Sequence, residues 1–425
     1  MVRDPLGLLE ASARVGDVVP LDMLGGMRVL LLNHPDDIAR VLVTDNRNFP
    51  KRHPFLAEMK RFVGEGVATS EGELWRRQRR VIQSAFARER VTTYCDDIAG
   101  CAARALDEWR PGEVRDLHAD FMRLVLEGTA RALFSAEMGG FGGEVVEAVS
   151  VVMDHFASPL FMIAPKLERL PLPRFRRLRA AQRRLEQIVG DVIRARRADA
   201  GTPRTDLLAA LLAARDERGA AMPDRQVFDE VMTLYIAGYE PMAVALGWTF
   251  HLLSKHPDAL ARASEEARAV LGGRAATHAD LPRMPLISAT IDECLRLYPP
   301  AWTSMREAEA ACEFHGHPVA RGGYVWFSSW IVHRDPRWYD APAEFRPERW
   351  LDGLARRLPR CAYLPYGAGP RMCVGAPLAG LELPAIVATV LARWRLEPVA
   401  GREPRPYPSI NLRPHGGVWM RPQAW

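Results

Sequence analysis

The chain has 425 residues, of which 48% are hydrophobic and 26% are charged, and its formal net charge is +5. This composition fits a folded globular protein and excludes a disordered one, and the length allows one large unit or two to three average domains. Nearly all of the positive charge is arginine, without the aromatic-interleaved basic stripe of nucleic-acid-binding proteins, so we expect no nucleic-acid partner. A basic patch that docks an acidic protein and a merely solvated surface are the remaining interpretations.

The six cysteines are dispersed and form no Cys-x-x-Cys pair, which argues against a zinc site or a disulfide framework. The first twenty residues contain no long apolar run, so we predict neither a signal peptide nor a membrane anchor. We therefore expect a cytoplasmic protein.

The predicted elements fall into three parts along the chain. Residues 15–32 predict two short strands around a Gly-Gly turn, and a helix begins after the next His-Pro pair, so the first part, about 15–70, is rich in β-structure. The second part, about 74–300, is overwhelmingly helical, with Pro and Gly interruptions. The third, about 300–425, predicts small strands, a meandering loop and a last helix. Because helices and small sheets are segregated without a linker, we predict one mainly α domain of the α+β class over residues 1–425.

The longest predicted helix covers residues 223–256 and is apolar on nearly all sides. It is too interrupted, and too charged at its ends, for a membrane span. A helix of this kind belongs in the centre of a large protein.

A glycine-rich loop opens the last helix just after Cys373, within residues 363–382 (YLPYGAGPRMCVGAPLAGLE). Backbone amides at a helix N-terminus can donate hydrogen bonds to a thiolate, and the helix dipole favours its negative charge. Arg371, two residues earlier, is able to pair with an anionic group. The loop therefore predicts a stable metal-bound thiolate, with a buried structural cysteine as the alternative.

This loop resembles the cysteine-loop signature of the cytochrome P450 family, F-x-x-G-x-R-x-C-x-G. The matching residues are Tyr366 (in place of Phe), Gly369, Arg371, Cys373 and Gly375. The resemblance implies the cytochrome P450 fold, a large helical bundle around a central long helix with small β-sheets. It also implies heme b (iron protoporphyrin IX) as cofactor, with Cys373 as the ligand of the haem iron.

Two further segments resemble motifs of the family, and their residues are expected to form a structural network. Glu293 and Arg296 lie three residues apart on one face of a predicted helix and resemble the E-x-x-R pair of the family. The segment FRPERW (345–350) resembles the meander motif, so Arg349 is expected to complete the network behind the cysteine loop. An isolated pair of this type is usually a surface ion pair.

The segment LWRRQRR (74–80) resembles helix C of the family. There the resemblance implies that Trp75 and Arg79, four residues apart, contact a haem propionate. Arg306, after the Pro-Pro turn, and Arg371 are expected to contribute to the same binding. A solvated basic helix face is the alternative.

The central helix carries Ala237, Gly238, Glu240 and Pro241, where the family pattern is A/G-G-x-D/E-T. In that pattern the acid and the alcohol guide protons to dioxygen at the haem, so Gly238, Glu240 and Pro241 are the candidate catalytic positions. A proline inside a helix costs ~3 kcal/mol or more and frees the carbonyl four residues earlier, here that of Ala237. That carbonyl can accept from a water or a substrate hydroxyl, although a plain packing kink requires the same bend.

Without the threonine, protons must come from ordered water, from Glu240 or from the substrate. Peroxide-using relatives that act on fatty acids carry Arg-Pro at this place, whereas this chain has the proline without the arginine. We therefore expect dioxygen chemistry.

The resemblance also implies a substrate pocket formed by residues of about 53–70, 155–170, the central helix, 301–305 and 408–412. Its candidate lining residues are Phe62, Phe156, Phe161, Met162, Leu234, Ala237, Trp302, Thr303 and Ile410. Each is apolar enough to be an ordinary core residue, but together they predict an apolar pocket for a terpenoid, polyketide or steroid-like molecule.

The resemblance implies a monooxygenase that hydroxylates such a substrate with dioxygen. Electrons are expected from NAD(P)H through a reductase and a ferredoxin that docks on the arginine-rich face near Cys373, and the enzyme is expected to be a monomer. The alternatives are oxidative coupling or cyclisation, an isomerisation that needs no reductant, and a non-catalytic haem-binding protein.

Overall fold

The structure is a computed structural model. It describes residues 4–23, 26–134, 142–156, 170, 172–199, 204, 206–215 and 219–425.

The N-terminal segment contains the two strands and the helix start that the sequence predicts. His34 caps the helix after the second strand, because its ring nitrogen accepts the Asp36 amide at 3.2 Å and Pro35 occupies the first turn. The elements are α1 (Pro5–Ala13), β1 (Val18–Asp22), β2 (Arg28–Leu32), α2 (Pro35–Ala39), η1 (Arg40–Thr44), η2 (Asn46–Asn48) and α3 (Pro54–Val63).

The middle of the chain is helical, and its longest helix, α11, confirms the predicted central helix to within one residue at each end. Asp224 in its first turn and Lys255 in its last turn complement the helix dipole. The elements of this part are α4 (Gly72–Ala85), α5 (Arg88–Leu106), β3 (Arg115–Asp116), α6 (Leu117–Phe134), α7 (Gly142–Phe156), α9 (Pro173–Ala198), α10 (Leu207–Ala213), α11 (Asp224–Lys255), α12 (Pro257–Leu271), η4 (His278–Arg283) and α13 (Pro285–Leu297).

The last part combines short strands, one-turn helices and the predicted final helix α17, which begins three residues after Cys373. Its elements are β4 (Ser304–Glu307), β5 (Cys312–Phe314), β6 (His317–Val319), β7 (Tyr324–Phe327), α14 (Ser329–Val332), α15 (Glu348–Leu351), α16 (Leu354–Arg357), η5 (Gly369–Arg371), α17 (Ala376–Arg393), β8 (Trp394–Pro398), β9 (Arg405–Pro408), β10 (Leu412–His415) and β11 (Trp419–Ala424).

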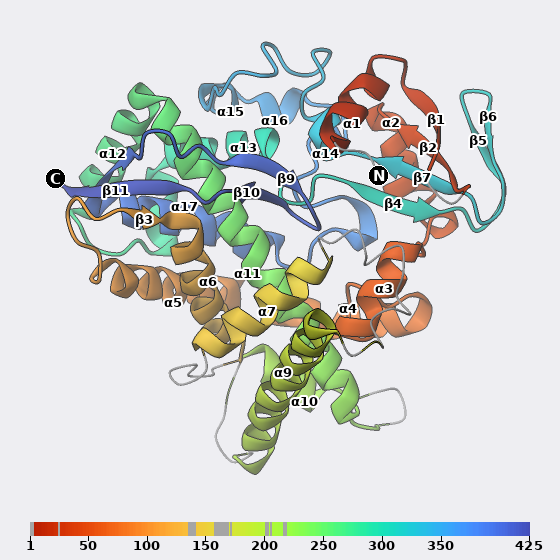
Figure 1. Cartoon of the computed structure of the whole chain (residues 1–425), viewed down its shortest axis with the longest axis horizontal. Coiled ribbons are helices and arrows are strands. Elements are labelled where there is room, and N and C mark those ends of the chain that lie inside the picture. The colour runs from red at the N-terminus through yellow and green to blue at the C-terminus, as the bar shows by residue number, and fades with distance from the viewer. Residues whose placement is uncertain are drawn as a thin grey trace.

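The sheets join segments that are far apart in the sequence. The largest has the strand order β1-β2-β7-β4, in which β2 runs parallel to β7 with Leu31 opposite Trp326. A second sheet, β3-β11-β8, pairs the C-terminal strand with β3, which directly precedes α6, and β9 and β10 form a hairpin. Figure 1 shows the four-stranded sheet at one end of the molecule and β3, β11 and the C-terminus at the other, with α11 among the helices between them.

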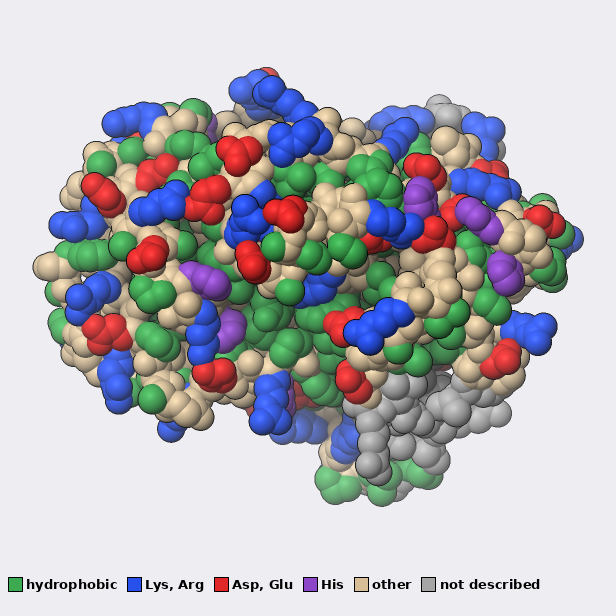
Figure 2. Space-filling model, turned by 90° about the horizontal axis from the view of Figure 1, so that it is seen from above, with side chains coloured by type: hydrophobic (Ala, Val, Ile, Leu, Met, Phe, Trp, Pro, Cys, Tyr) green, Lys and Arg blue, Asp and Glu red, His purple; other side chains and the backbone are tan. Residues whose placement is uncertain are grey.

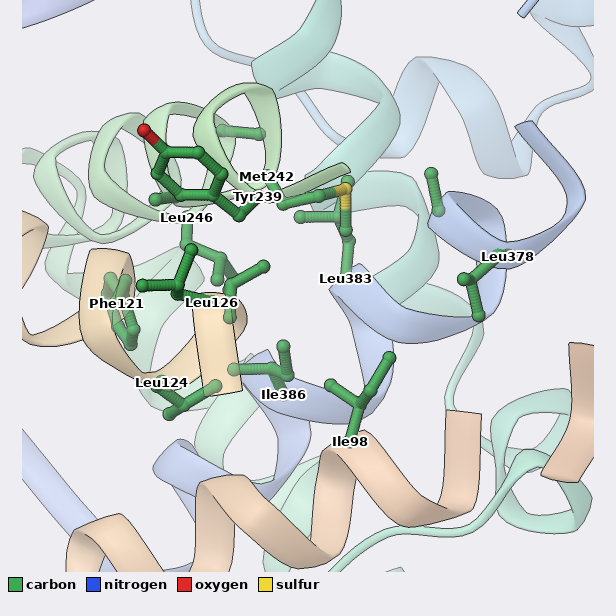
Figure 3. Close-up of a cluster of buried hydrophobic side chains, with 14 of the residues drawn as sticks. Ile98, Phe121, Leu124, Leu126, Tyr239, Met242, Leu246, Leu378, Leu383 and Ile386 are labelled. Atoms are coloured by element: carbon green, nitrogen blue, oxygen red, sulfur yellow. The ribbon is translucent and has the colours of Figure 1, made fainter. Parts of the chain in front are cut away.

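The main hydrophobic core lies where α11 packs against α6, and α17 against α5. In Figure 3, Tyr239 and Met242 of α11 lie above Leu126 of α6, with Ile386 of α17 beneath them. Because these apolar side chains come from three helices of distant sequence position, their burial fixes the central helix relative to the start of α17, and hence relative to Cys373.

On the face drawn in Figure 2, Lys and Arg side chains lie between Asp and Glu side chains, around apolar surface near the middle. One helix in the described part of the chain, Ala376–Arg393, has the length and mean hydropathy (1.4) of a membrane span, and 72% of it is buried inside the protein.

Candidate functional site

The cysteine loop makes a tight turn, and at Gly369 the turn has room only for a glycine. Gly369 has φ +70°, and a Cβ atom there would lie 1.9 Å from the carbonyl oxygen of Leu42. After this turn the Cys373 amide donates to the Tyr366 carbonyl at 2.9 Å, and Gly375 becomes the N-cap of α17. The loop thereby holds the cysteine directly before a helix N-terminus.

The Cys373 thiol is the most accessible cysteine of the chain, although it lies inside the protein. The residue is exposed, yet desolvation by the surrounding protein raises the pKa of the thiol. The amides of Gly375 and Ala376 donate to the sulfur, and together with the charge of Arg79 they act to lower the same pKa. These groups favour a thiolate that is directed at a ligand.

Cationic side chains gather beside the cysteine loop, and two of them, Arg79 and Lys51, act on the sulfur itself. Arg79 donates to the Met372 carbonyl at 2.8 Å, and Arg371 donates to Glu71 at 2.5 Å and to the Ser70 carbonyl at 2.9 Å. The guanidinium of Arg371 also stacks on the ring of Trp75, 3.8 Å from its centroid. The helix-C and cysteine-loop residues that the sequence predicts are therefore brought together, with Arg76 and Arg77 exposed outside the cluster.

Arg306 and Lys51 complete the cluster. Burial is the first cause of a lowered pKa in Arg306 and Arg371, each to about 10, and in Lys51, to about 7, with repulsion from neighbouring cations as a further cause. Glu71 is the carboxylate that opposes them in all three cases. Such an excess of buried positive charge favours an anionic ligand.

These residues fit a haem on two independent grounds. The thiol supplies an iron ligand that backbone amides prepare for negative charge, and the cations beside it match a group with two propionate carboxylates. The arrangement therefore fits a haem-thiolate centre.

The central helix contributes an accessible turn at Pro241. Ala237 is exposed although α11 is otherwise mostly buried there, and Pro241 lies within the helix without ending it. A Cβ atom on Gly238 would lie 3.2 Å from Cγ2 of Thr129, so this glycine also permits the close packing of α11 on α6.

The acid of the central motif is held by the C-terminal hairpin. Glu240 is 1% exposed, and its two carboxylate oxygens accept from Arg413 at 2.6 Å and from the Asn411 amide at 2.8 Å. Arg413 also lies 3.5 Å from the exposed carboxylate of Asp154. Glu240 is therefore held in place by the C-terminal hairpin.

The predicted Glu293 network is present in the structure, fully buried. Glu293 binds Arg296 through two contacts of 2.8 and 2.9 Å and accepts from Arg349 at 3.0 Å. Arg296 further donates to three backbone carbonyls of the meander, those of His333, Pro342 and Glu344. The pair thus fixes the meander onto α13.

The segment before helix C, part of the expected pocket wall, is tied to α11 by two acids. The Glu65 amide donates to Asp229 and the Val67 amide donates to Glu230, both at 2.9 Å. Burial raises the pKa of Glu230 to about 7. Gly66 allows this approach, since a Cβ atom there would lie 2.1 Å from Oγ1 of Thr233.

The candidate pocket residues fall in different surroundings. The rings of Phe62 and Phe156 make an edge contact at 4.9 Å, and Leu234 and Ile410 belong to or pack against the same main core. Trp302 instead lies in a separate core cluster around Leu9, and its indole donates to the Ser409 carbonyl at 2.8 Å. Thr303 donates to the Phe327 carbonyl at 3.1 Å and accepts from the indole of Trp326. Phe161 and Met162 lie outside the described residues.

Four residues of this centre were not predicted from the sequence: Lys51, Glu71, Asn411 and Arg413. They come from connections or a hairpin, and no spacing rule links them to the cysteine loop. The sole signal for Lys51 is that it is a lysine in a chain whose cations are nearly all arginine.

Comparison with known proteins identifies the family. The family model described as Cytochrome P450 matches residues 8–421. The chain is 37% identical over 401 residues to cyclooctat-9-en-7-ol 5-monooxygenase of Streptomyces melanosporofaciens, covering 94% of this chain and 86% of the relative. It is 34% identical over 409 residues to pentalenene oxygenase of Streptomyces avermitilis, covering 96% and 90%. The crystal structure of the cytochrome P450DA heme domain superposes with a TM-score of 0.90 at 25% identity, covering 99% of this chain and 93% of that one.

The chain belongs to the cytochrome P450 family. The predicted fold is confirmed, and the protein is a P450 monooxygenase, a class that uses haem iron and oxygen. The two relatives described above are named as oxygenases of cyclooctat-9-en-7-ol and of pentalenene.

Proposed function

We propose that the protein hydroxylates a terpenoid natural product as a cytoplasmic monomer, with electrons from NAD(P)H through a reductase and a ferredoxin. The observation that carries the proposal is the accessible Cys373 thiol, which backbone amides prepare for negative charge beside the cations Arg79 and Lys51. The names of the relatives support a terpenoid over a polyketide or steroid-like substrate. Residues 1–425 are proposed to act as one domain, which the pairing of β2 with β7 supports.

In this proposal Cys373 binds the iron of heme b, and Arg79, Arg306 and Arg371 bind its propionates, with Trp75 supporting Arg371. When bound, the haem supplies the redox chemistry that places one oxygen atom of dioxygen in a substrate C–H bond and releases the other as water. The reaction consumes two electrons and two protons. The remaining task of the chain is to hold the substrate, exclude stray water and deliver those protons.

Proton delivery is proposed to occur at the turn of Ala237 and Pro241. Proline has no amide hydrogen, so the Ala237 carbonyl lacks its usual helical donor and can accept from a water or a substrate hydroxyl. Glu240 lies one residue before the proline, and its ion pair with Arg413 holds a negative charge near that water. In this view the ordered water replaces the missing threonine, with Glu240 as the fixed acid behind it.

The second candidate function is oxidative coupling or cyclisation, and Pro241 is the observation that favours it. A reaction that removes two hydrogen atoms from the substrate without inserting oxygen depends less on an alcohol that relays protons at this position.

The test is in two stages. The reduced carbon monoxide complex must show the strongly red-shifted band of a thiolate-ligated haem, and Cys373→His must lack it. Cyclic terpene hydrocarbons are then supplied with a ferredoxin, its reductase and NADPH under ¹⁸O₂. A product that carries one ¹⁸O atom supports hydroxylation, while dehydrogenated or coupled product without ¹⁸O supports the second candidate. Product formed without reductant would indicate an isomerase, and absence of turnover would indicate a haem-binding protein without catalytic function.

A further inference from the structure

Helix α9 concentrates the positive charge of the chain. It contains nine arginines against one glutamate and one aspartate, so this single helix is more positive than the whole chain, whose net charge is +5. Six of the arginines lie in residues 173–184 (PRFRRLRAAQRR), where no acidic residue occurs. A general preference for arginine would spread over the chain, so this concentration on one helix needs its own explanation.

The two halves of α9 are neutralised unequally. In the C-terminal half each arginine has a carboxylate partner, and the pairs are Arg194–Asp191, Arg196–Asp206 and Arg197–Asp224. In the N-terminal half, Arg177 and Arg184 pair with glutamates of α7. Arg174, Arg176 and Arg183 are exposed there and form no ion pair with a described residue. Uncompensated positive charge therefore gathers on the outer side of the N-terminal half.

This placement is unfavourable within the protein itself. The helix dipole favours acidic side chains in the first turn, yet the first turn of α9 holds Arg174 and Arg176 and no acidic residue. Arginines spaced three or four residues apart, such as Arg179 and Arg183, also repel one another. The N-cap residue, Leu172, offers no side-chain acceptor to the free amides of this turn. A negative charge outside the protein would relieve all of these deficits.

Two exposed leucines lie beside the uncompensated arginines. Leu170 is 43% and Leu172 is 49% exposed, and both come just before the first turn of α9. Together with Arg174, Arg176 and Arg183 they form what we call the α9 basic face. Leucines next to arginines match the surface of an anionic bilayer, where cations meet the phosphate groups and apolar side chains reach the acyl boundary. An acidic protein surface would match the arginines alone.

The α9 basic face covers an element that carries part of the candidate substrate pocket. On its buried side α9 packs against α7, where the rings of Phe175 and His155 make an edge contact at 6.3 Å. His155 directly precedes Phe156, a candidate pocket residue. In Figure 1, α9 lies in the lower part of the molecule, away from the four-stranded sheet and from the C-terminal strands. A bilayer at this face would therefore lie close to the pocket wall.

We propose that the α9 basic face is a docking surface for an anionic lipid bilayer. The contact is peripheral, with the three arginines at the lipid phosphates and the two leucines at the acyl boundary, and it needs no membrane-spanning segment. Binding itself is independent of the proposed reaction. Its use rests on the proposed function, because a terpenoid hydrocarbon dissolves better in a bilayer than in water and would reach the pocket from there.

The experiment measures the partition of the holoprotein onto vesicles of phosphatidylglycerol and phosphatidylcholine in equal parts, by sedimentation at low and at high salt. The test variant, Arg174→Gln/Arg176→Gln/Arg183→Gln, removes three positive charges from the α9 basic face. A second variant, Leu170→Gln/Leu172→Gln, removes its apolar part. The carbon monoxide spectrum and urea unfolding establish that each variant is folded and holds its haem.

The matched control, Arg283→Gln/Arg356→Gln/Arg360→Gln, changes the net charge by the same amount. These three arginines are exposed and form no ion pair with a described residue, and they lie outside α9. The control therefore separates the α9 basic face from the overall charge of the protein.

We expect wild type and control to bind the anionic vesicles alike. The three substitutions in the test variant should lower the partition coefficient about a hundredfold. Binding should weaken at high salt and be absent with vesicles of phosphatidylcholine alone, because the attraction is electrostatic. The leucine variant should bind more weakly than wild type and keep the same dependence on salt.

Absence of wild-type binding to the anionic vesicles would overturn the proposal, and so would equal binding of wild type and test variant. Soluble polyglutamate supplies negative charge without a bilayer. If polyglutamate binds through the α9 basic face and the vesicles do not, the partner is an acidic protein and the bilayer is excluded. Failure of the proposed haem site is distinguishable, because wild type would then lack the red-shifted carbon monoxide band whatever its binding to vesicles.

Discussion

Arg413 donates its Nε hydrogen to Glu240 at 2.6 Å, and this ion pair ties the C-terminal hairpin to the middle of the central helix. Asn411, two residues earlier, binds the other oxygen of the same carboxylate. Ile410, a candidate pocket residue, directly precedes Asn411. A substrate that displaces this loop would therefore also displace the acid that lies one residue before Pro241, and in the proposed function this would couple substrate binding to proton delivery.

Removal of Arg413 should leave the Glu240 carboxylate buried without a cation. We expect Arg413→Met to lower the free energy of unfolding of the holoprotein by about 3 kcal/mol, the order found when one partner of a buried pair is deleted. Urea unfolding measures this value, with Arg405→Met, an exposed arginine on β9 of the same hairpin, as the control.

The double variant Arg413→Met/Glu240→Gln should recover most of the loss, since no buried charge then remains. Strictly additive effects of the two substitutions would contradict a direct interaction.

Pro241→Thr should raise the fraction of consumed NADPH that appears as product, because a hydroxyl then stands where the family relays protons. The same change restores an amide donor in the helix and should stabilise the protein by up to about 3 kcal/mol. Pro241→Ala is the matched control, since it restores the amide without the hydroxyl. An equal gain in both variants would assign the effect to helix geometry, and no gain in either would refute a role of Pro241 in proton delivery.

Glu293→Gln should destabilise the folded structure around the cysteine loop. The carboxylate accepts from Arg296, Arg349 and the indole of Trp350, all within 3.0 Å. Its neutral isostere leaves two guanidinium groups buried without a counter-charge, at a cost of about 3–5 kcal/mol. Haem content per folded protein and urea unfolding check this loss. Glu344→Gln, exposed on the same meander, should behave like wild type.

Periodicity and spacing predicted the parts of the fold that local sequence controls. The central helix, the last helix and the strands of residues 15–32 follow from apolar patterning and Pro or Gly boundaries, and the Glu293–Arg296 pair follows from helical spacing. The parallel pairing of β2 with β7 was not predicted, because nothing local encodes a partner about 300 residues away.

The polar partners in the site were not predicted either, because nothing in the local sequence encodes a distant partner. Glu71 meets Lys51 and Arg371 only through the fold, and Arg413 lies 173 residues after Glu240 in the sequence. Motif spacing reports residues on one element, whereas charge balance depends on all the elements that enclose a site.

Because of the buried Glu382 carboxyl, we predict that the free energy of unfolding decreases as the pH rises. It is 3% exposed on α17, and its Oε1 has no hydrogen-bond partner among the described residues. Burial raises the pKa of this carboxyl to about 8 from 4.5. The folded state thus binds the proton more tightly than the unfolded chain does. The stability that this group contributes is complete below the unfolded pKa and is lost as the pH rises through the folded pKa.

The loss between pH 5 and pH 8 should amount to several kcal/mol, with about 5 kcal/mol as the upper bound for a shift of this size. Glu382→Gln cannot ionise, so its stability advantage over wild type should grow from near zero at pH 5 to a plateau above pH 8. Cys95 and Tyr366 are the titratable neighbours, and both stay neutral in this range because burial raises their pKa values, that of Cys95 to about 12. Urea unfolding of the holoproteins at four pH values, with exposed Glu265→Gln as the control, measures the difference. A stability difference that does not change from pH 5 to pH 8 would show that Glu382 finds a partner for its charge.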